Sequence, residues 1–287
     1  MAIELRPAQW MKNLFVWAAL LFTVPHVSVR MVGLEIVCFM LFCLVSGCVY
    51  VLNDILDLPV DRLNPDKAGR PIASGRIRPD FAAFVGGFLL VLSFATGWKV
   101  SPWLFAVLGA YFLVNVLYSW RLKHVALLDI FAIASGFVLR AVGGGVAIGV
   151  PLTSWFLICA MMLSLFLAIG KRRYELVLWQ KYGIMARRVI PQYSLEFLNQ
   201  MSGVTATMVI LTYSMFTLSS GHGHALTVTV PLVAYGVFRY MQLTLAGDKG
   251  GKPEWVLLHD RQLQVVGVVF AAVVIALECT AIHLRPY

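Results

Sequence analysis

The feature that most constrains this chain is a series of long apolar stretches separated by short polar ones. About 20 consecutive apolar residues are what an α-helix needs to cross the hydrocarbon core of a bilayer. Nine windows of this kind occur, at residues 14–26, 34–52, 81–98, 103–120, 127–150, 155–170, 201–220, 226–245 and 263–283. The sequence therefore predicts an all-α, polytopic membrane protein with nine transmembrane helices.

The composition also indicates that much of the apolar surface of the chain is exposed to lipid. Hydrophobic residues make up 60% of the 287 residues and charged residues only 13%, which is far from the mixture found in soluble domains. We expect residues 1–287 to form a single transmembrane domain. We expect the first window to be a membrane span of the mature chain and not a signal peptide, because no small-residue cleavage site follows it.

Two windows leave the count open between eight and ten. The first is short and needs residues 8–12 as an interfacial turn. The fifth contains Gly143-Gly144-Gly145, a run that either packs tightly against a neighbouring helix or unwinds.

The positive charges predict the orientation. With the N-terminus in the cytoplasm, 19 of the 23 Lys and Arg residues face the cytoplasm, three face outward and Arg140 lies within a span. Lys and Arg are enriched in cytoplasmic loops of membrane proteins. The net charge of +9 is thereby explained by membrane orientation, and we expect no binding of nucleic acid.

Acidic residues gather directly after the second window, in the segment from Asn53 to Asp61. Asn53 and Asp57 are four residues apart and share a helix face, whereas Pro59 ends or kinks the helix before Asp61. Asp54, Asp57 and Asp61 repel one another unless a cation relieves them. Oxygen ligands of this kind are typical of Mg²⁺, which shares its coordination shell with water and substrate phosphates. The alternative is a solvated loop with scattered acids.

Basic residues follow at once, and they include Arg62, Lys67, Arg70, Arg76 and Arg78. Guanidinium groups beside a carboxylate–metal site suit a diphosphate ligand. The enrichment of positive charge on the cytoplasmic side would also explain most of these residues. Of the group, Arg70 is the residue that we expect to be functional.

A second charged segment closes the sixth window, with Lys171, Arg172 and Glu175. Lys171 and Glu175 are one helical turn apart, and the simple interpretation is a weak surface ion pair. The functional interpretation makes Lys171 and Arg172 phosphate clamps and Glu175 a metal ligand or ribose acceptor. Arg140, inside the membrane, must face a polar partner, either a lipid phosphate or an acid such as Glu175, while Asp129 is interpreted as a helix cap.

The pattern Asn53-Asp54-x-x-Asp57-x-x-x-Asp61, with Arg70-Pro71 and Ser74-Gly75 after it, resembles the first signature of the UbiA superfamily of intramembrane prenyltransferases. The resemblance implies nine helices around a central cavity, a cytoplasmic polar cap and Mg²⁺-dependent diphosphate chemistry. The second signature of that superfamily is a pair of aspartates four residues apart. Here Glu175 and Trp179 take those places, which argues against an allylic prenyl diphosphate donor.

Further motifs resemble a branch of the superfamily that transfers 5-phosphoribosyl from phosphoribosyl pyrophosphate to a polyprenyl, decaprenyl-type phosphate. They are Leu5-Arg6-Pro7-x-Gln9-Trp10-x-Lys12-Asn13, Tyr118-Ser119 with Leu122-Lys123-His124, Leu139-Arg140-Ala141, Gly170-Lys171-Arg172 and Asp260-Arg261. Arg173-Tyr174 departs from that branch. The resemblance implies a bacterial plasma-membrane enzyme making a precursor of a cell-envelope polysaccharide, and it leaves a homo-oligomer open.

The resemblance and the charge pattern together give the expected site. Its metal ligands are Asn53, Asp57 and Asp61, and its catalytic residues are Asp57, Asp61, Lys171 and Glu175. Its substrate-binding residues are Lys12, Asn53, Asp54, Lys67, Arg70, Tyr118, Lys123, Arg140, Arg172, Asp260 and Arg261.

Two rival functions stay open at this point. An aromatic prenyltransferase of the same superfamily would use a polyprenyl diphosphate donor and would want a second acidic pair, which the loop after the sixth window lacks. A secondary transporter would place its charges near the membrane midplane, whereas this chain gathers them at one face.

Overall fold

The computed structural model describes residues 4–23, 26–62, 68–183, 187–219, 224–246, 256 and 259–283. The predicted all-α fold class is confirmed, since the described residues contain helices and no strand. The elements are η1 (Pro7–Trp17), α1 (Ala18–Leu21), α2 (Val29–Leu56), α3 (Leu58–Asp61), α4 (Pro79–Val100), α5 (Pro102–Trp120), η2 (Leu122–His124), α6 (Leu128–Ile148), α7 (Ser154–Tyr182), η3 (Ile190–Gln192), α8 (Leu195–Ser219), η4 (His224–Thr229), α9 (Val230–Ala246) and α11 (Arg261–His283).

Helix boundaries follow from capping chemistry. The hydroxyl of Ser28 accepts a hydrogen bond from the backbone N–H of Met31 at the start of α2, and Thr153 accepts one from Phe156 at the start of α7. Side-chain oxygens at this position satisfy donors that have no partner within the helix. At the other ends, Gly149 after α6 and Gly183 after α7 have positive φ, the conformation that commonly terminates helices.

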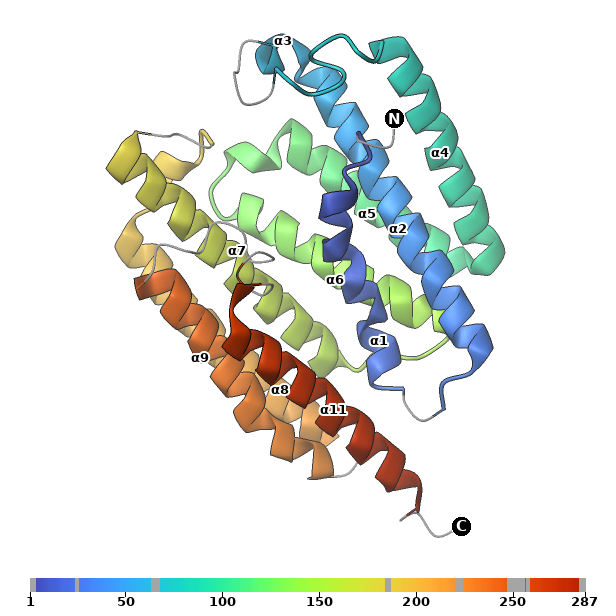
Figure 1. Cartoon of the computed structure of the whole chain (residues 1–287), viewed down its shortest axis with the longest axis vertical. Coiled ribbons are helices and arrows are strands. Elements are labelled where there is room, and N and C mark those ends of the chain that lie inside the picture. The colour runs from blue at the N-terminus through green and yellow to red at the C-terminus, as the bar shows by residue number, and fades with distance from the viewer. Residues whose placement is uncertain are drawn as a thin grey trace.

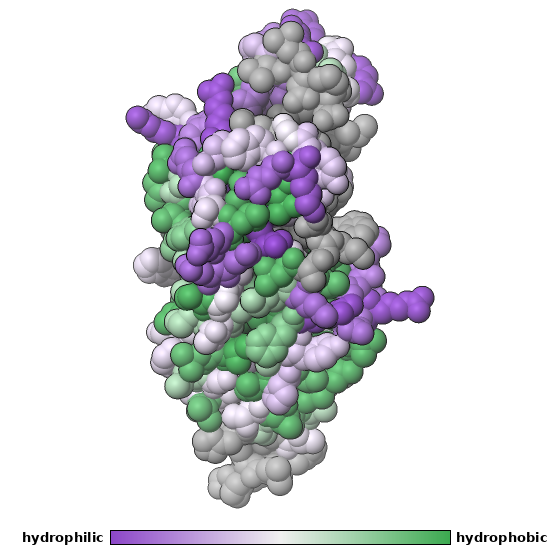
Figure 2. Space-filling view, turned by 90° about the vertical axis from the view of Figure 1, so that its left-hand side faces the viewer, coloured by the Kyte–Doolittle hydropathy of each residue, from purple (hydrophilic) through white to green (hydrophobic). Residues whose placement is uncertain are grey.

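Six helices of the described chain, α2 and α4–α8, are long and apolar enough to cross a bilayer. The remaining expected spans coincide with η1 and α1, with η4 and α9, and with α11. The chain is thus a multi-pass membrane protein, while the count of nine stays a prediction. Figure 2 shows hydrophilic residues gathered toward the upper end of one face and mainly hydrophobic residues below.

The first expected span is not a regular α-helix. Residues Pro7–Trp17 form a 3₁₀ helix, and the backbone carbonyl of Val16 lies so close to Gly144 that an added Cβ would stand 2.1 Å from its oxygen. The glycine run that contains Gly144 lies within the continuous helix α6, with Phe42 and Leu152 against its neighbours. Of the two alternatives for this run, the structure therefore shows tight packing.

Helix α6 lies in the middle of the bundle, between α2, α4 and α5 on one side and α7, α8, α9 and α11 on the other (Figure 1). It contacts α2, α5, α7 and η1. One apolar cluster joins α2, α5 and α6 through Phe42, Leu108 and Ala147. Another joins α6, α7 and α8 through Ile130, Ile169 and Leu198. The central helix therefore fixes the two halves of the bundle relative to each other.

The ends of five elements define what we call the polar end of the bundle. They are the C-terminal ends of α2, α5 and α7, the N-terminal end of α6, and the short helix α3 (Figure 1). Contacts of α6 with η2 and of α5 with η2 draw these ends together. The charged segments singled out in the sequence are carried by these ends.

Candidate active site

The acidic segment is bent where the sequence predicts. Helix α2 ends at Leu56, Asp57 caps it, and α3 begins at Leu58, one residue before Pro59. The N–H of Asp57 still donates to the carbonyl of Asn53, and the N–H of Asp61 donates to that of Asp57. Successive one-turn steps therefore place Asn53 at the end of α2, Asp57 at its cap and Asp61 at the last position of α3.

Two arginines neutralise the buried carboxylates of this segment. Arg70 Nη1 lies 2.8 Å from Asp54 Oδ1 and 2.6 Å from Asp61 Oδ2, and Arg6 Nη2 lies 2.6 Å from both oxygens of Asp54. Charge-assisted contacts of this kind are the stronger hydrogen bonds in proteins. Asp54, Asp61, Arg6 and Arg70, with Asn53 and Asp57, are here named the acidic cluster.

Asp57 differs from its two acidic neighbours because it is partly exposed. Its side chain retains 35% of its accessible surface, against 2% for Asp54 and 1% for Asp61. The ammonium of Lys123, on η2, lies 3.8 Å from Asp57 Oδ2. Asp57 is thus the carboxylate that a soluble ligand reaches most directly.

The donor set of the acidic cluster fits a hard divalent cation shared with a substrate. Among the described residues, no three His, Cys, Asp or Glu side chains form a ready-made metal cage. The expected ligands Asn53, Asp57 and Asp61 supply two carboxylates and one amide, which leaves other positions for water and phosphate oxygens. Mg²⁺ is usually held in this way, by one or two carboxylates plus substrate phosphates.

The second charged segment is built around a buried cation. Arg172, with none of its surface exposed, donates from Nε to Asp129 Oδ2 and from Nη1 to Glu175 Oε2, the latter over 2.7 Å. Tyr193 donates its hydroxyl to Asp129 Oδ1 over 2.6 Å. Burial, together with this contact, raises the pKa of Tyr193. We name Asp129, Arg172, Glu175, Tyr193 and the groups around them the Arg172 cluster.

The position of Arg172 corrects its expected role as a phosphate clamp. A guanidinium that is fully buried and held by two carboxylates does not reach a soluble phosphate. Asp129, expected as a simple helix cap, is instead the main acidic partner of Arg172. The arrangement is a buried ion network, in which each charge depends on its partner.

The more exposed side of the Arg172 cluster carries Arg187, Tyr118 and Lys171. Arg187 donates from Nη1 to the Tyr118 hydroxyl over 2.5 Å, and its Nε lies 3.7 Å from Glu175 Oε1. Its guanidinium also lies over the Tyr118 ring, 5.8 Å from the centroid. Lys171 precedes Arg172 on α7 and is only partly buried, and Lys12 is close enough to interact with it electrostatically.

Arg140 does not pair with Glu175. Its guanidinium donates to Asn13 Oδ1 over 2.6 Å, to the Tyr111 hydroxyl over 2.7 Å and to the carbonyl of Gly136 over 2.9 Å. These contacts tie η1 to α5 and α6 through neutral oxygens. An intramembrane arginine with polar partners in the bundle interior is the expected arrangement, but its partners differ from the acid considered from the sequence.

Two expected site residues, Asp260 and Arg261, belong to neither cluster. Asp260 accepts hydrogen bonds from Arg239 Nη2 over 2.8 Å and from the N–H of Leu263 over 3.0 Å. The Arg239 contact holds the pKa of Asp260 below its usual value. Asp260 thus caps α11, with Arg261 as the exposed first residue of that helix. Lys67 lies outside the described residues.

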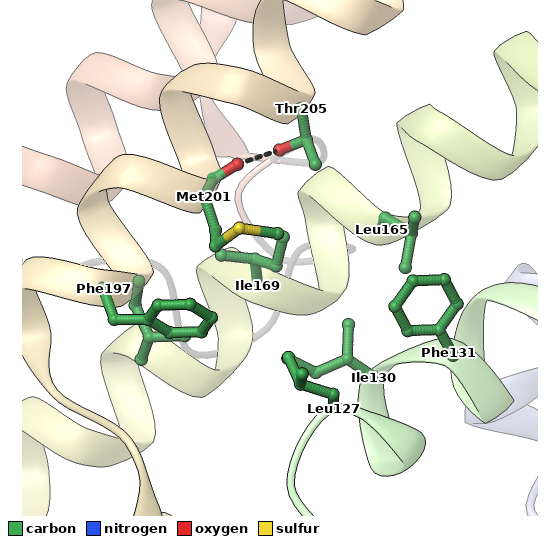
Figure 3. Close-up of a pocket in the computed structure, with 9 residues that line it drawn as sticks. Leu127, Ile130, Phe131, Leu165, Ile169, Phe197, Met201 and Thr205 are labelled. Carbon is green, nitrogen blue, oxygen red and sulfur yellow. Dashed lines mark hydrogen bonds between the residues drawn. The ribbon is translucent and has the colours of Figure 1, made fainter.

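An apolar pocket lies beside the Arg172 cluster, between α6, α7 and α8 (Figure 3). Ile130, Phe131 and Ile169 line it, with Phe197 and Met201 on the far side. The one hydrogen bond drawn there runs from Thr205 Oγ1 to the carbonyl of Met201. This pocket offers no charged group, so the candidate site is the polar end and not this pocket.

Sequence reasoning missed Arg6, Arg187 and Tyr193 as members of the site. Arg6 and Arg187 were treated as ordinary cytoplasmic charges, and Tyr193 carried no pattern of its own. The motif around Arg6 did stand out, but nothing local indicated that its partner is Asp54, 48 residues away.

Comparison with known proteins identifies the family. Residues 13–260 match the UbiA prenyltransferase family, and this chain belongs to it. A decaprenyl-phosphate phosphoribosyltransferase of Mycolicibacterium smegmatis is 34% identical over 93% of this chain and 90% of that relative. The enzyme of the same name from Mycobacterium tuberculosis is 33% identical over 94% and 91% of the two chains.

Solved structures agree on the fold. A UbiA homolog from Archaeoglobus fulgidus bound to DMAPP and Mg²⁺ superposes with a TM-score of 0.72 over 98% of both chains, at 20% identity. The chain thus has the fold of an intramembrane transferase family. Some members of that family have been seen with divalent cations.

Proposed function

We propose that this protein transfers the 5-phosphoribosyl group of phosphoribosyl pyrophosphate to a decaprenyl-type polyprenyl phosphate and releases diphosphate. The observation that carries the proposal is the Arg172 cluster. Where a second metal-binding aspartate pair is typical of prenyl diphosphate users, this chain has one acid, Glu175, beside Lys171 and Arg187. The names of the full-length relatives support the same reaction.

The acidic cluster is the proposed diphosphate end of the site. Asn53, Asp57 and Asp61 would hold Mg²⁺, which supplies charge neutralisation for the departing diphosphate. Asp54 keeps Arg6 and Arg70 beside these ligands. Arg70, with 27% of its side chain exposed, is placed to contact diphosphate oxygens, and Lys123 approaches the same space from η2.

The proposed reaction requires no proton transfer by a protein side chain. An oxygen of the lipid phosphate attacks C1 of the ribose while the bond from C1 to the diphosphate oxygen breaks, and the electron pair leaves with the diphosphate. A phosphate monoester is already mostly a dianion near pH 7, so no general base is required. Catalysis then rests on positioning and on stabilising negative charge.

The Arg172 cluster is the proposed sugar end. Lys171 and Lys12 present ammonium groups to the 5-phosphate, with Tyr118 beside them. Glu175, 10% exposed and already tied to Arg172, accepts from a ribose hydroxyl or shares in holding the metal. Arg140, Asp260, Arg261 and Lys67 remain proposed substrate-binding residues on the strength of the motif resemblance alone.

We further propose that the polar end faces the cytoplasm of a bacterial plasma membrane and that residues 1–287 form one domain. The excess of Lys and Arg in the loops of this end supports that orientation. A reporter fused after Lys67 or Lys181 should therefore report a cytoplasmic site, and one after Gly223 an external site. An external signal at Lys67 would contradict access to a cytosolic sugar donor.

A competition assay tests the reaction itself. Purified protein is given Mg²⁺, polyprenyl phosphate and equal amounts of phosphoribosyl pyrophosphate and geranyl diphosphate, and the lipid product is identified by mass spectrometry. The expected product carries a pentose phosphate. A product without it, or a prenylated aromatic when an aromatic acceptor is supplied, would instead establish the aromatic prenyltransferase alternative.

A further inference from the structure

Residues 4–6, directly before η1, lie between α2 and residues 68–78, which are here named the Arg70 loop. Glu4 is 2% exposed, and its Oε1 accepts a hydrogen bond of 2.9 Å from the backbone N–H of Ile72. Ile72 is itself fully buried and packs with Val51 and Ala82. A segment distant in sequence thus ties down the loop two residues after Arg70.

Leu5 is wedged against α2 at a glycine. A Cβ added to Gly47 would stand 2.6 Å from Leu5 Cδ2 and 3.3 Å from Leu5 Cα. The carbonyl of Leu5 accepts a hydrogen bond from Trp10 Nε1 over 3.1 Å. Only a residue without a side chain lets this segment lie so close to the helix.

Arg6 completes the contact in a backbone conformation that is uncommon for its residue type. Its φ is 49° and its ψ 65°, the left-handed region that costs energy for a residue with a Cβ. That conformation directs the guanidinium to Asp54 and over the ring of Tyr50, 4.7 Å from its centroid. Asp54 in turn holds Arg70.

We propose that residues 4–6 form a latch that holds the Arg70 loop against α2, and that Glu4 and Arg6 are positioning residues for the diphosphate end of the site. The proposal rests on the proposed function for the identity of the ligand. The latch acts at two points, through Glu4 on the backbone at Ile72 and through Arg6 and Asp54 on the Arg70 side chain. Neither Glu4 nor Arg6 has to touch the substrate.

Amide hydrogen exchange can test the latch without any substrate. Glutamine has the same length as Glu4 and keeps a side-chain oxygen that can accept from the Ile72 N–H. Hydrogen–deuterium exchange at Ile72 should quicken by about tenfold or more in Glu4→Ala, as expected for loss of a hydrogen bond and its burial. Glu4→Gln should keep the slow exchange of the wild type.

A glycine pair supplies a test that changes no charge. Gly47→Ala pushes Leu5 away and should release the latch, whereas Gly33→Ala lies on the same helix with nothing within 4 Å of the added Cβ. Gly47→Ala should therefore quicken exchange at Ile72, and Gly33→Ala should leave it unchanged. Exchange at Ile72 that stays slow in both Glu4→Ala and Gly47→Ala would overturn the latch.

Kinetics separate positioning from general stability. Glu4→Ala and Arg6→Ala should raise the KM for phosphoribosyl pyrophosphate by about tenfold, the change that one ordinary charge-assisted contact produces, with the KM for polyprenyl phosphate unchanged. Arg78→Ala, at the end of the same loop with 84% of its side chain exposed, is the matched control and should behave as wild type. Glu4→Gln should restore the wild-type KM.

The two proposals fail in different ways. A wild-type protein that transfers no phosphoribosyl group contradicts the proposed function, while the exchange experiment on the same protein still tests the latch. If Glu4→Ala and Arg6→Ala lower the amount of active enzyme and leave both KM values unchanged, these residues are merely structural and the positioning role is wrong.

Discussion

The two charged clusters at the polar end differ in which of their charges are buried. In the acidic cluster the carboxylates of Asp54 and Asp61 are buried, and the arginines that neutralise them, Arg6 and Arg70, keep about a quarter of their surface. In the Arg172 cluster the cation is at the centre with 0% exposed, and Glu175 lies toward the outside with Arg187. Asp129 is also 0% exposed, so the Arg172 cluster buries a cation together with its acids, whereas the acidic cluster buries the acids and leaves its arginines partly exposed.

The difference shows what each cluster can offer a ligand. A ligand meeting the acidic cluster finds Asp57, a partly exposed carboxylate that accepts a cation. At the Arg172 cluster a ligand can contact Lys171 and Arg187. Glu175, which lies 3.7 Å from Arg187, neutralises only part of their positive charge. Phosphoribosyl pyrophosphate has a metal-binding diphosphate at one end and a phosphate at the other, and the two clusters suit those ends separately.

The largest effect is expected from removing the exposed charge of the acidic cluster. Asp57→Asn keeps the shape of the side chain but removes a ligand charge, and we expect transfer to fall by more than about a hundredfold, since even outer-shell losses at metal sites reach that size. The measurement is transfer of labelled phosphoribosyl to polyprenyl phosphate across a range of Mg²⁺ concentrations.

EDTA should abolish phosphoribosyl transfer by the wild type in the same assay, and added Mg²⁺ or Mn²⁺ should restore the transfer. Asp80→Asn, an exposed acid at the start of α4, is the control and should leave transfer unchanged. Substantial activity of Asp57→Asn with Mg²⁺ present would rule out its assignment as a metal ligand.

A stability loss should distinguish the Arg172 cluster from the acidic one. Arg172→Met leaves Asp129 and Glu175 as buried acids without their main counter-ion, and breaking a buried pair in this way typically costs about 3–5 kcal/mol. We expect a clear drop in the thermal unfolding midpoint of the detergent-solubilised protein. Arg121→Met, at an exposed position of the same end, should change the midpoint little.

A second substitution checks the cause of that loss. Replacing Asp129 by asparagine in the Arg172→Met protein removes one of the two carboxylates that have lost Arg172 and should recover part of the stability. If the double variant is less stable than Arg172→Met alone, the loss comes from packing and not from an uncompensated carboxylate.

The helices were largely predictable, because the forces that form them are local. Apolar windows gave the all-α membrane fold, and Pro59 predicted the break between α2 and α3, which the structure places at Asp57. The 3₁₀ form of η1 was not predictable, because it depends on how closely Val16 approaches Gly144 on a distant helix. Hydropathy along the sequence does not predict contacts between segments that are far apart in the chain.

The site was predictable in its residue types and less so in its pairing. Asp61 and Arg70 were expected together and are in contact, since they are close in sequence. The partners of Arg172 and Arg140 could not be predicted, because Asp129 is 43 residues from Arg172 and Asn13 is 127 residues from Arg140. One sequence does not show which of several charges at one membrane face meet.

A moderate effect on donor binding should come from Lys171. Lys171→Ala removes a cation that we place at the 5-phosphate, and loss of a charge-assisted contact costs about 1–3 kcal/mol. The dissociation constant for phosphoribosyl pyrophosphate, measured by calorimetry, should rise, and that for polyprenyl phosphate should not. Lys99→Ala, at the opposite end of the bundle, is the matched control, and equal weakening of both ligands by Lys171→Ala would contradict the sugar-end assignment.

The smallest effect, and the finest test of the comparison, concerns Tyr118. Its hydroxyl accepts hydrogen bonds from Arg187 over 2.5 Å and from Arg172 over 3.4 Å, so it links the buried and exposed cations of one cluster. Tyr118→Phe removes this acceptor but keeps the ring under the Arg187 guanidinium. One net hydrogen bond is worth about 0.5–1.5 kcal/mol, and we expect donor affinity to weaken by roughly three- to tenfold, with the unfolding midpoint nearly unchanged. If Tyr118→Phe instead lowers the midpoint as strongly as Arg172→Met, the hydroxyl belongs to the buried network, and Arg187 is then a structural residue that does not serve the donor.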